Sequence, residues 1–319
     1  MKNKIKYLFL FISFLLIVSC SNYEDIYDAI EGNNVKAVKK FVENGPDILA
    51  RVNYYYEETP LFNAVRVSDN VDIINYLIEA GSDLNIEGQS VLQVAARYNE
   101  NLEIIDALID TGADINAKNE NGYTPLMSAS FNDGNWKVVK TLVDSGADIN
   151  ARDDYGRTPF LIASRCNNSE TVSFLIDAGS DINACSDESL NALMLASAYN
   201  EDNPEVIKVL VKAGLDINEI NDNGCFPLML AAKNNYNPKI ISTLVDLGAN
   251  VNARDFTGFT PLMYAAMFNG SRIIEALIKE GADVNAVNAF NNTAFDCMKM
   301  GEYFSDSKGY KLLEKLTKK

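Results

Sequence analysis

Between residues 122 and 150, apolar positions recur at the spacing of two short helices. The first helix is expected to begin at Pro125, because a proline at the first helical position loses no hydrogen bond and Thr124 can cap the free amides. The second helix has an apolar stripe of four residues: Val138, Val139, Leu142 and Val143. Gly146 follows as the left-handed residue that commonly ends a helix. Helices this short are marginal alone in water, so the pair must pack against neighbours.

The same landmarks recur along the chain, which is the signature of a repeat protein. The closing glycine returns at intervals of 31 to 36 residues, at Gly45, Gly81, Gly112, Gly146, Gly179, Gly214, Gly248 and Gly281. The opening Thr-Pro-Leu returns in related form at residues 59–61, 90–92, 124–126, 158–160, 191–193, 226–228, 260–262 and 293–295. Two series of landmarks with one period predict a row of similar helix pairs, each burying its apolar stripe against the next.

These motifs resemble the ankyrin repeat family, whose unit is a β-turn followed by two antiparallel helices, with a Thr-Pro-Leu-His opening and a Gly-Ala-Asp-Val-Asn ending. The resemblance covers about residues 23–300. It implies an all-α solenoid of about eight to nine helix-turn-helix units with short β-turn fingers, capped at both ends. Within a repeat domain at 20–319, the units are expected at 23–52, 57–86, 88–119, 122–153, 156–186, 189–221, 224–255 and 258–288, with a C-terminal cap at 291–319.

The chain departs from the family pattern at three places. The histidine after Thr-Pro-Leu is replaced by Phe62, Gln93, Met127, Leu161, Met194, Met229 and Met263. The resemblance implies that this imidazole ties repeats together, so thioether packing is expected to replace part of that network. The finger at 86–89 is three residues shorter than the others, which predicts a stunted turn. The connection after the first unit is two residues longer than the others. It holds Tyr54, Tyr55 and Tyr56, which form either a contact surface or a lid over the first helices.

Residues 1–19 have the layout of a secretory signal: three lysines precede an apolar run from 7 to 18 that is too short for a comfortable membrane span. The run ends Leu-Ile-Val-Ser before Cys20, which resembles a bacterial lipobox and implies lipidation of Cys20. The expected location is the bacterial cell envelope, with Cys20 anchored in the outer membrane or in a periplasm-facing membrane surface. A plain signal peptide cleaved elsewhere and an uncleaved anchor are the alternatives.

The charge balance limits the partners. The chain has 28 basic and 44 acidic residues, and its formal net charge is −16. We expect no nucleic-acid partner, because phosphate contacts require a basic surface. An acidic array is also repelled by anionic lipid, so membrane contact is expected only through the N-terminal lipid. The chain is expected to be a monomer.

The residue types needed for common catalytic and metal sites are missing. The chain has no histidine, which removes Ser-His and Cys-His nucleophile pairs and zinc sites of the ordinary type. It has no nucleophile-elbow, phosphate-loop or dinucleotide motif, and its Asp-Ile-Asn segments are expected to stabilise turns rather than bind calcium. We therefore expect no catalytic residue, metal or cofactor. Free thiols are expected at Cys166, Cys185, Cys225 and Cys297, with a structural disulfide as the alternative.

The remaining expectation is a recognition surface. In the family, finger tips and inner-helix positions form a concave groove, and the matching positions here are rich in tyrosine, arginine and phenylalanine, which anchor protein interfaces. The candidate partner-binding residues are Arg97, Tyr98, Tyr123, Phe131, Arg152, Tyr155, Arg157, Arg165, Tyr199, Arg254, Phe256, Phe259 and Phe268. Arg66, Arg97, Arg165 and Lys233 occupy one equivalent position of the repeat, and for them pairing with nearby carboxylates is the alternative.

The function expected from this surface is a non-catalytic scaffold that holds a partner protein. Two other classes stay open. One is a structural or spacer component of the cell envelope without a single defined ligand. The other is an enzyme that uses carboxylates.

Overall fold

The computed structural model describes residues 23, 25–45, 49, 59–86, 88–131, 136–166, 168–201, 203–300 and 307–317. These residues contain 18 helices and one two-stranded β-ladder. The predicted signal segment 1–19, the lipidation site Cys20 and residues 54–56 lie outside the described part, so those expectations stay predictions. Of the described helices, none is both long and apolar enough to span a membrane.

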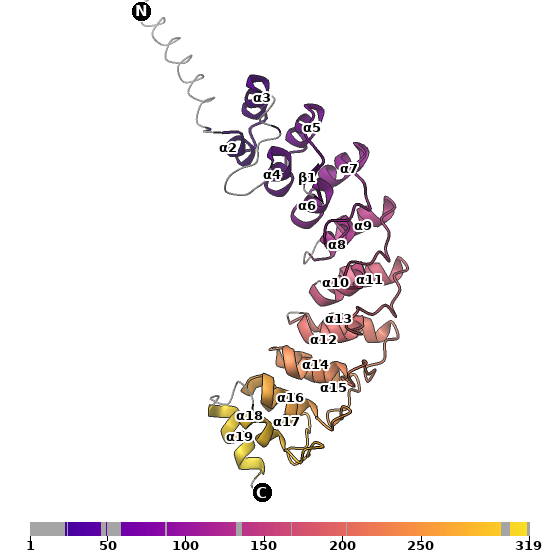
Figure 1. Ribbon diagram of the computed structural model, residues 1–319, viewed down its shortest axis with the longest axis vertical. Helices are drawn as coiled ribbons and strands as arrows, with labels where there is room; N and C mark the ends of the chain where they lie inside the picture. Colours follow the sequence, from indigo (N-terminus) through magenta and orange to yellow (C-terminus); the bar gives the residue numbers. More distant parts are fainter. Residues whose placement is uncertain are drawn as a thin grey trace, which may run out of the picture.

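The helices form two stacked rows along a curved array (Figure 1). The inner row, on the concave side, is α2 (Ile26–Glu31), α4 (Pro60–Val67), α6 (Val91–Tyr98), α8 (Pro125–Ser130), α10 (Pro159–Cys166), α12 (Ala192–Tyr199), α14 (Pro227–Asn234), α16 (Pro261–Phe268) and α18 (Ala294–Met300). The outer row is α3 (Val35–Asn44), α5 (Val71–Glu79), α7 (Leu102–Asp110), α9 (Trp136–Asp144), α11 (Ser169–Asp177), α13 (Pro204–Lys212), α15 (Pro238–Asp246), α17 (Ser271–Lys279) and α19 (Ser307–Thr317). Each helix contacts its equivalent in the next pair, which confirms the predicted all-α solenoid.

The core runs without interruption between the two rows. Inner helices contribute alanines without exposed surface: Ala64, Ala95, Ala129, Ala163, Ala196, Ala231 and Ala265. Outer helices contribute branched side chains that are equally buried, as in Ile104, Ile105 and Leu108 of α7. Small residues on one row let the larger residues of the other fill the space at the density of a protein interior. The ends of the array follow the same rule, since α18 and α19 pack on α16 and α17 as a further helix pair.

Most helix ends follow the predicted chemistry, although Thr59 before α4 makes no side-chain cap. Thr124 caps α8, because its side-chain oxygen accepts the Met127 N–H at 3.3 Å. Gly146 ends α9 with φ +97°, in the left-handed region. Gly45 after α3 has the same place in the repeat but an extended φ of −175°, so the left-handed ending predicted for this glycine series does not apply there.

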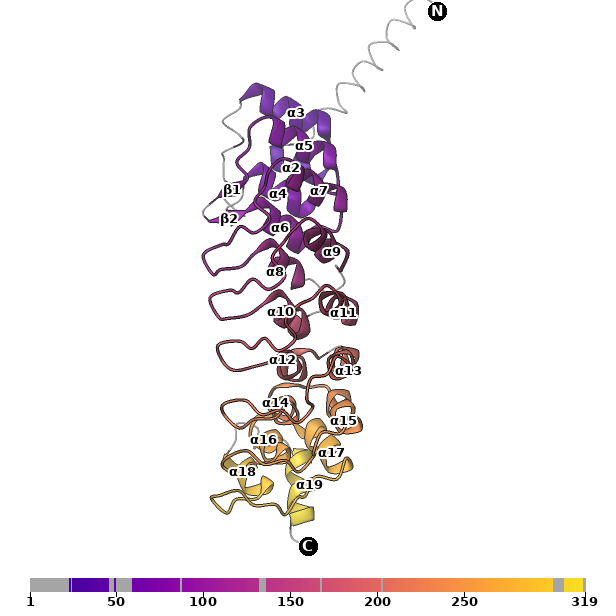
Figure 2. The same ribbon diagram turned by 90° about the vertical axis from the view of Figure 1, so that its right-hand side faces the viewer.

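The fingers project from one edge of the stack (Figure 2). The shortened finger forms a regular hairpin in which β1 (Asn85–Ile86) pairs with β2 (Gln89–Ser90). Gly88 in its tight turn has φ +76°. The finger predicted to be stunted is therefore short, yet it carries the β-ladder of the described residues.

Contacts between units replace the missing histidines in two ways. The four methionines at that position are at most 1% exposed, which agrees with the expected thioether packing: Met127, Met194, Met229 and Met263. Gln93 behaves differently, because its Nε2 donates to the carbonyl of Ala117 at 3.0 Å, at the end of its own unit, and to that of Tyr123 at 2.5 Å in the next unit. A polar tie between neighbouring units survives at this one position.

The Asp-Ile-Asn segments stabilise turns, as expected, and they also join units. Oδ1 of Asp148 accepts the N–H of Asn150 at 3.0 Å within one turn. Oδ1 of Asn150 then accepts the N–H of Asp181 at 2.9 Å in the next unit. The same step recurs from Asn116 to Asp148 and from Asn252 to Asp283. These bonds hold successive connections in register.

Candidate protein-binding surface

Five of the described fingers are fixed at their base by an Asn or Asp side chain. Oδ1 of Asp153 accepts the backbone N–H groups of Tyr155 at 2.9 Å and Arg157 at 2.8 Å. Equivalent side chains close four other fingers, at Asn119, Asn221, Asp255 and Asn288. In one further finger a hydroxyl takes this place, since Oγ of Ser186 accepts the N–H of Leu190 at 3.4 Å. Because short polar side chains bond to backbone two residues on, they define the conformation of each finger tip.

Three finger cations hold the neighbouring finger. Nζ of Lys118 donates to the carbonyl of Arg152 at 3.0 Å, and Nη2 of Arg152 donates to the carbonyl of Cys185 at 2.6 Å. Nη1 of Arg254 donates to the carbonyl of Val287 at 2.6 Å. The predicted partner-binding residues Arg152 and Arg254 thus use some of their N–H donors within the array. Their acceptors are carbonyls rather than carboxylates.

The side chain of Arg157 makes several contacts with neighbouring finger residues. Its Nε lies 2.8 Å from Oδ2 of Asp153, and its Nη2 donates to the Tyr123 hydroxyl. Its guanidinium also lies over the rings of Tyr123 and Tyr155, at 5.3 and 4.7 Å from their centroids. Arg157 thus pairs with a carboxylate and fixes the aromatic residues around it.

Cations of the inner helices behave in another way. Arg97 lies over the ring of Phe131 at 5.1 Å, and Arg165 lies over the ring of Tyr199 at 4.6 Å. Lys233 lies over the ring of Phe268 at 5.0 Å. In every case the ring belongs to the next unit, and among the described residues no carboxylate lies within ion-pair distance of these three cations. Among the residues that the structure describes, Arg97 and Arg165 therefore pair with rings rather than with carboxylates.

These contacts form three cation–ring pairs along the inner helices, here together called the cation–aromatic stripe. It consists of Arg97, Phe131, Arg165, Tyr199, Lys233 and Phe268. Cation and ring alternate from unit to unit at the C-terminal ends of the inner helices α6, α8, α10, α12, α14 and α16. Cation–π contacts of this kind stabilise by about 0.5–2 kcal/mol each and hold the charged group in a defined place.

The predicted aromatic residues fall into two classes. Four are strongly exposed: Phe256 at 72%, Tyr155 at 57%, Tyr98 at 53% and Tyr199 at 42%. The others are partly buried in ring contacts, among them Tyr123 with Phe131 at 5.5 Å. Phe259 and Phe268 both lie against the ring of Tyr264, at 5.7 and 6.4 Å. The first class provides contact area, whereas the second forms the platform beneath it.

A row of buried asparagines was missed by the sequence argument. Nδ2 of Asn269 donates to the carbonyls of Ala232 at 3.1 Å and Asn235 at 2.8 Å. Asn235 does the same toward Ser197 and Asn200. Equivalent donors are Asn99 and Asn200. The signal was present, because these asparagines directly follow or nearly follow their inner helices at related repeat positions.

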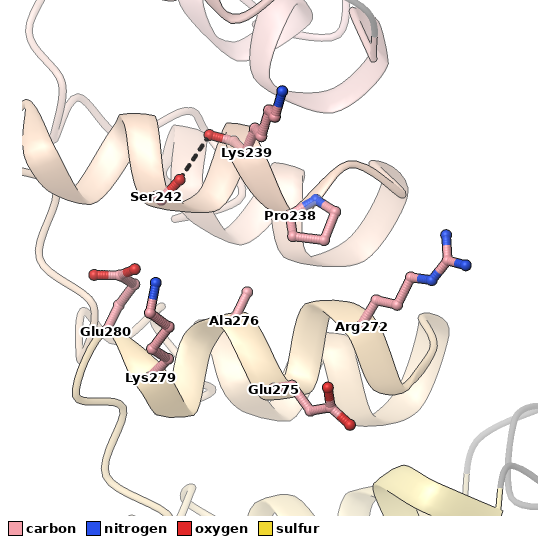
Figure 3. Close-up of a pocket in the computed structure, with 8 residues that line it drawn as sticks. All are labelled: Pro238, Lys239, Ser242, Arg272, Glu275, Ala276, Lys279 and Glu280. Atoms are coloured by element: carbon pink, nitrogen blue, oxygen red, sulfur yellow. Dashed lines mark hydrogen bonds between the residues drawn. The ribbon is translucent and has the colours of Figure 1, made fainter.

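Two hollows show where a ligand of small size would find room. One of about 470 Å³ lies between fingers and inner helices, lined in part by Tyr199, Lys233 and Tyr264. Another of about 400 Å³ lies between outer helices α15 and α17 (Figure 3). There the charged groups of Lys239 and Arg272 come from different helices and lie well apart in Figure 3, so they form no common centre. The first hollow is continuous with the cation–aromatic stripe, since two of its lining residues belong to it.

The cysteines and acidic residues form no recognisable chemical centre in the residues that the structure describes. No group of three or more potential metal ligands occurs there, and Cys166, Cys185, Cys225 and Cys297 are all free thiols. Burial raises the pKa of the Cys297 thiol to about 11, aided by the charge of Asp296. A thiol with a raised pKa is a weak nucleophile at neutral pH.

Comparison with known proteins agrees with this geometry. A family model for ankyrin repeats in three copies matches residues 81–153, 150–221 and 193–288, and the single ankyrin repeat matches residues 56–89. Among solved structures, the crystal structure of the human ASB11 ankyrin repeat domain is similar, with a TM-score of 0.60. It is 23% identical and covers 71% of this chain and 97% of that chain, which shows the fold alone. A search of curated proteins found no match.

Proposed function

The chain belongs to the ankyrin repeat family, and from this premise we propose that it is a non-catalytic scaffold that binds a partner protein through the concave side of the stack. Ankyrin repeats are generally protein-interaction scaffolds and typically lack catalysis. The observation that carries the proposal is the exposure of Tyr98, Tyr155, Tyr199 and Phe256 on fingers and inner helices, between 42% and 72%. Large aromatic side chains exposed on a rigid frame are typical anchors of protein interfaces.

The frame supports this role because it is fixed before a partner arrives. Finger tips are held by Asp153 and its equivalents, and neighbouring fingers are joined by Arg152 and Arg254. A surface that is ordered in the free protein avoids part of the entropy cost of association. A partner that buries the exposed rings therefore loses less binding free energy to ordering of this surface.

The test is crosslinking in the native envelope. A photoreactive residue replaces Tyr155 in the full chain, and the adducts are compared with those formed when Tyr98→Ala and Phe256→Ala are also present. We expect one discrete adduct that these two substitutions weaken about tenfold or more. The matched control is Tyr236→Ala, because Tyr236 is 54% exposed but lies between α14 and α15, near Arg272 of the outer row.

The same experiment separates the scaffold from the alternatives. A broad set of adducts, insensitive to Tyr98→Ala and Phe256→Ala, would favour a structural or spacer component of the envelope and contradict the proposal. An equal loss of adduct in the Tyr236→Ala control would show that the effect is not specific to the concave side.

We further propose that the scaffold is exported and anchored by lipid at Cys20, as a monomer at the outer membrane or a periplasm-facing membrane surface. The support is the segment before Cys20, with its lysines, its apolar run and its Leu-Ile-Val-Ser ending. Self-repulsion by the net charge of −16 supports the monomer. Metabolic labelling with a tagged fatty acid, followed by fractionation, tests the anchor: Cys20→Ser should abolish both label and membrane retention. Retention without label would indicate an uncleaved anchor instead, and light scattering of the released chain tests the monomer.

A further inference from the structure

We propose that the cation–aromatic stripe binds an extended, acidic segment of the partner whose carboxylates recur at intervals of about six residues. This inference rests on the proposed protein-binding function and specifies the chemistry of the partner. It follows from the free donors of the stripe, its charge and its spacing.

The two arginines of the stripe keep N–H donors for a partner. Arg97 and Arg165 lie over aromatic rings, and in the described part of the chain neither has a carboxylate or hydrogen-bond acceptor in range. A guanidinium that stacks on a ring still presents its N–H groups along its edge, in the fork that matches a carboxylate. Arg152 and Arg157, by contrast, already use donors on Cys185 and Asp153. The two stripe arginines are therefore held in place, and among the described residues their N–H donors have no acceptor.

The stripe is positively charged on an acidic molecule. On a chain with net charge −16, the stripe brings three cations to one face without a carboxylate partner among the described residues. Burial raises the pKa of the Cys166 thiol, and the positive charges of Arg165, Arg157 and Arg97 oppose that rise. The charges of two stripe residues, Arg165 and Arg97, thus reach the last residue of α10. A positive region within an acidic molecule attracts a segment of opposite charge.

The cations of the stripe are evenly spaced along the array. Arg97, Arg165 and Lys233 occupy alternate units, and neighbouring helix axes lie about 8–10 Å apart, so successive cations are about 20 Å apart. An extended chain advances about 3.3 Å per residue, so about six residues cover that distance. Six is an even number, which places the carboxylates on one face of an extended segment. The rings between the cations offer apolar area to the residues between the carboxylates.

The fingers limit the other side of the segment. Their exposed tips carry Glu120, Asp154, Glu188 and Asp222. These carboxylates repel acidic residues on the side of the segment that faces the fingers. The segment is therefore acidic toward the inner helices and neutral or basic toward the fingers.

The experiment uses the full mature chain and three fluorescent synthetic peptides of one length. In the first, glutamates recur at intervals of about six residues in a glycine and threonine background. In the second, the same glutamates are adjacent, and in the third they are replaced by glutamine. Fluorescence anisotropy should show that the first peptide binds about tenfold more tightly than either of the others, with binding that weakens as salt rises.

Variants assign the binding to the stripe. Arg97→Gln with Arg165→Gln should weaken binding of the first peptide about a hundredfold, since each lost charge-assisted hydrogen bond corresponds to about tenfold. Arg97→Lys with Arg165→Lys keeps the charge but loses the fork, so an intermediate loss is expected. The matched control is Arg272→Gln with Lys239→Gln, at the hollow of the outer row, which should leave binding unchanged. Far-ultraviolet circular dichroism checks that every variant is folded.

Equal affinity for the spaced and adjacent glutamates would overturn the inference, and so would equal losses in the stripe and control variants. Its failure can be told apart from failure of the proposed function by the envelope crosslink. If the Arg97→Gln and Arg165→Gln chain still captures the partner while Tyr98→Ala and Phe256→Ala abolish capture, the scaffold stands and the acidic segment is wrong. If the aromatic substitutions have no effect either, the scaffold itself is wrong.

Discussion

Nε of Arg157 lies 2.8 Å from Oδ2 of Asp153, a carboxylate whose side chain has no exposed surface. The other oxygen of Asp153 accepts two backbone N–H groups of the finger. Arg157→Ala would therefore leave a buried charge without its ion-pair partner. We expect the free energy of unfolding to fall by about 3 kcal/mol, measured by urea denaturation with circular dichroism.

The control for this prediction is an exposed pair of the same sequence spacing. Lys140 and Asp144 lie within ion-pair distance, with side chains 47% and 59% exposed. Lys140→Ala should lower the free energy of unfolding by about 0.5 kcal/mol or less. Similar small losses in both variants would mean that burial does not strengthen the pair in the finger.

A second prediction concerns the buried asparagines. Asn235 has no exposed surface, and its Nδ2 donates to carbonyls of the preceding unit, at 3.0 Å to Ser197 and 3.4 Å to Asn200. Asn235→Ala leaves these carbonyls with fewer donors and should lower the free energy of unfolding by about 1–3 kcal/mol. Asn234→Ala is the matched control, because in the described part of the chain the side chain of Asn234 donates within its own helix, to Leu230, and not to another unit. A loss in the control as large as in Asn235→Ala would rule out the inter-unit bonds as the cause.

The sequence predicted the array because its landmarks have local causes. Thr124 and Pro125 define a helix start, and Gly146 defines a helix end, whatever the neighbouring units do. Gly45 occupies the same place in its repeat but has an extended conformation. Periodicity alone therefore predicted the stack but not the backbone conformation of every landmark.

The candidate surface was harder to predict because it depends on contacts across units. Arg97 and Phe131 are separated by one repeat, and only the stacked structure shows that the guanidinium lies over the ring. Arg157 was chosen as a contact residue from its finger position, but it is occupied by Asp153 and Tyr123. Residue type and repeat position thus located the surface, while the division between exposed anchors and supporting residues needed coordinates.

A third prediction compares two glycines with positive φ. Gly112 has φ +90° and open space where a Cβ would lie, so Gly112→Ala should cost only the strain of the left-handed conformation, about 1 kcal/mol. Gly122 has φ +76°, and a Cβ there would lie 3.0 Å from the backbone nitrogen of Asp154 in the next finger. Gly122→Ala should therefore cost about 1–2 kcal/mol more than Gly112→Ala, in the same denaturation assay. Equal costs would show that the neighbouring finger moves aside freely.

A fourth prediction concerns alkaline pH. The side chain of Cys297 on α18 has no exposed surface, and its pKa rises from 9.0 to about 11, first through burial and then through the charge of Asp296. Between these two values the unfolded chain releases the thiol proton while the folded chain keeps it. The stabilisation is thus complete below pH 9 and is lost as the pH rises toward 11.

Cys297→Ala isolates this effect, because the tyrosines whose pKa values are also raised, Tyr76, Tyr123 and Tyr264, are present in both chains. The variant is expected to start from a lower free energy of unfolding, since it loses buried contacts, but to fall less steeply than the parent chain as the pH rises from 9 to 11. Urea denaturation at several pH values in that range measures both slopes. Parallel slopes would mean that the Cys297 thiol ionises equally easily in the folded and unfolded chains, which contradicts its burial between α18 and the helices packed on it.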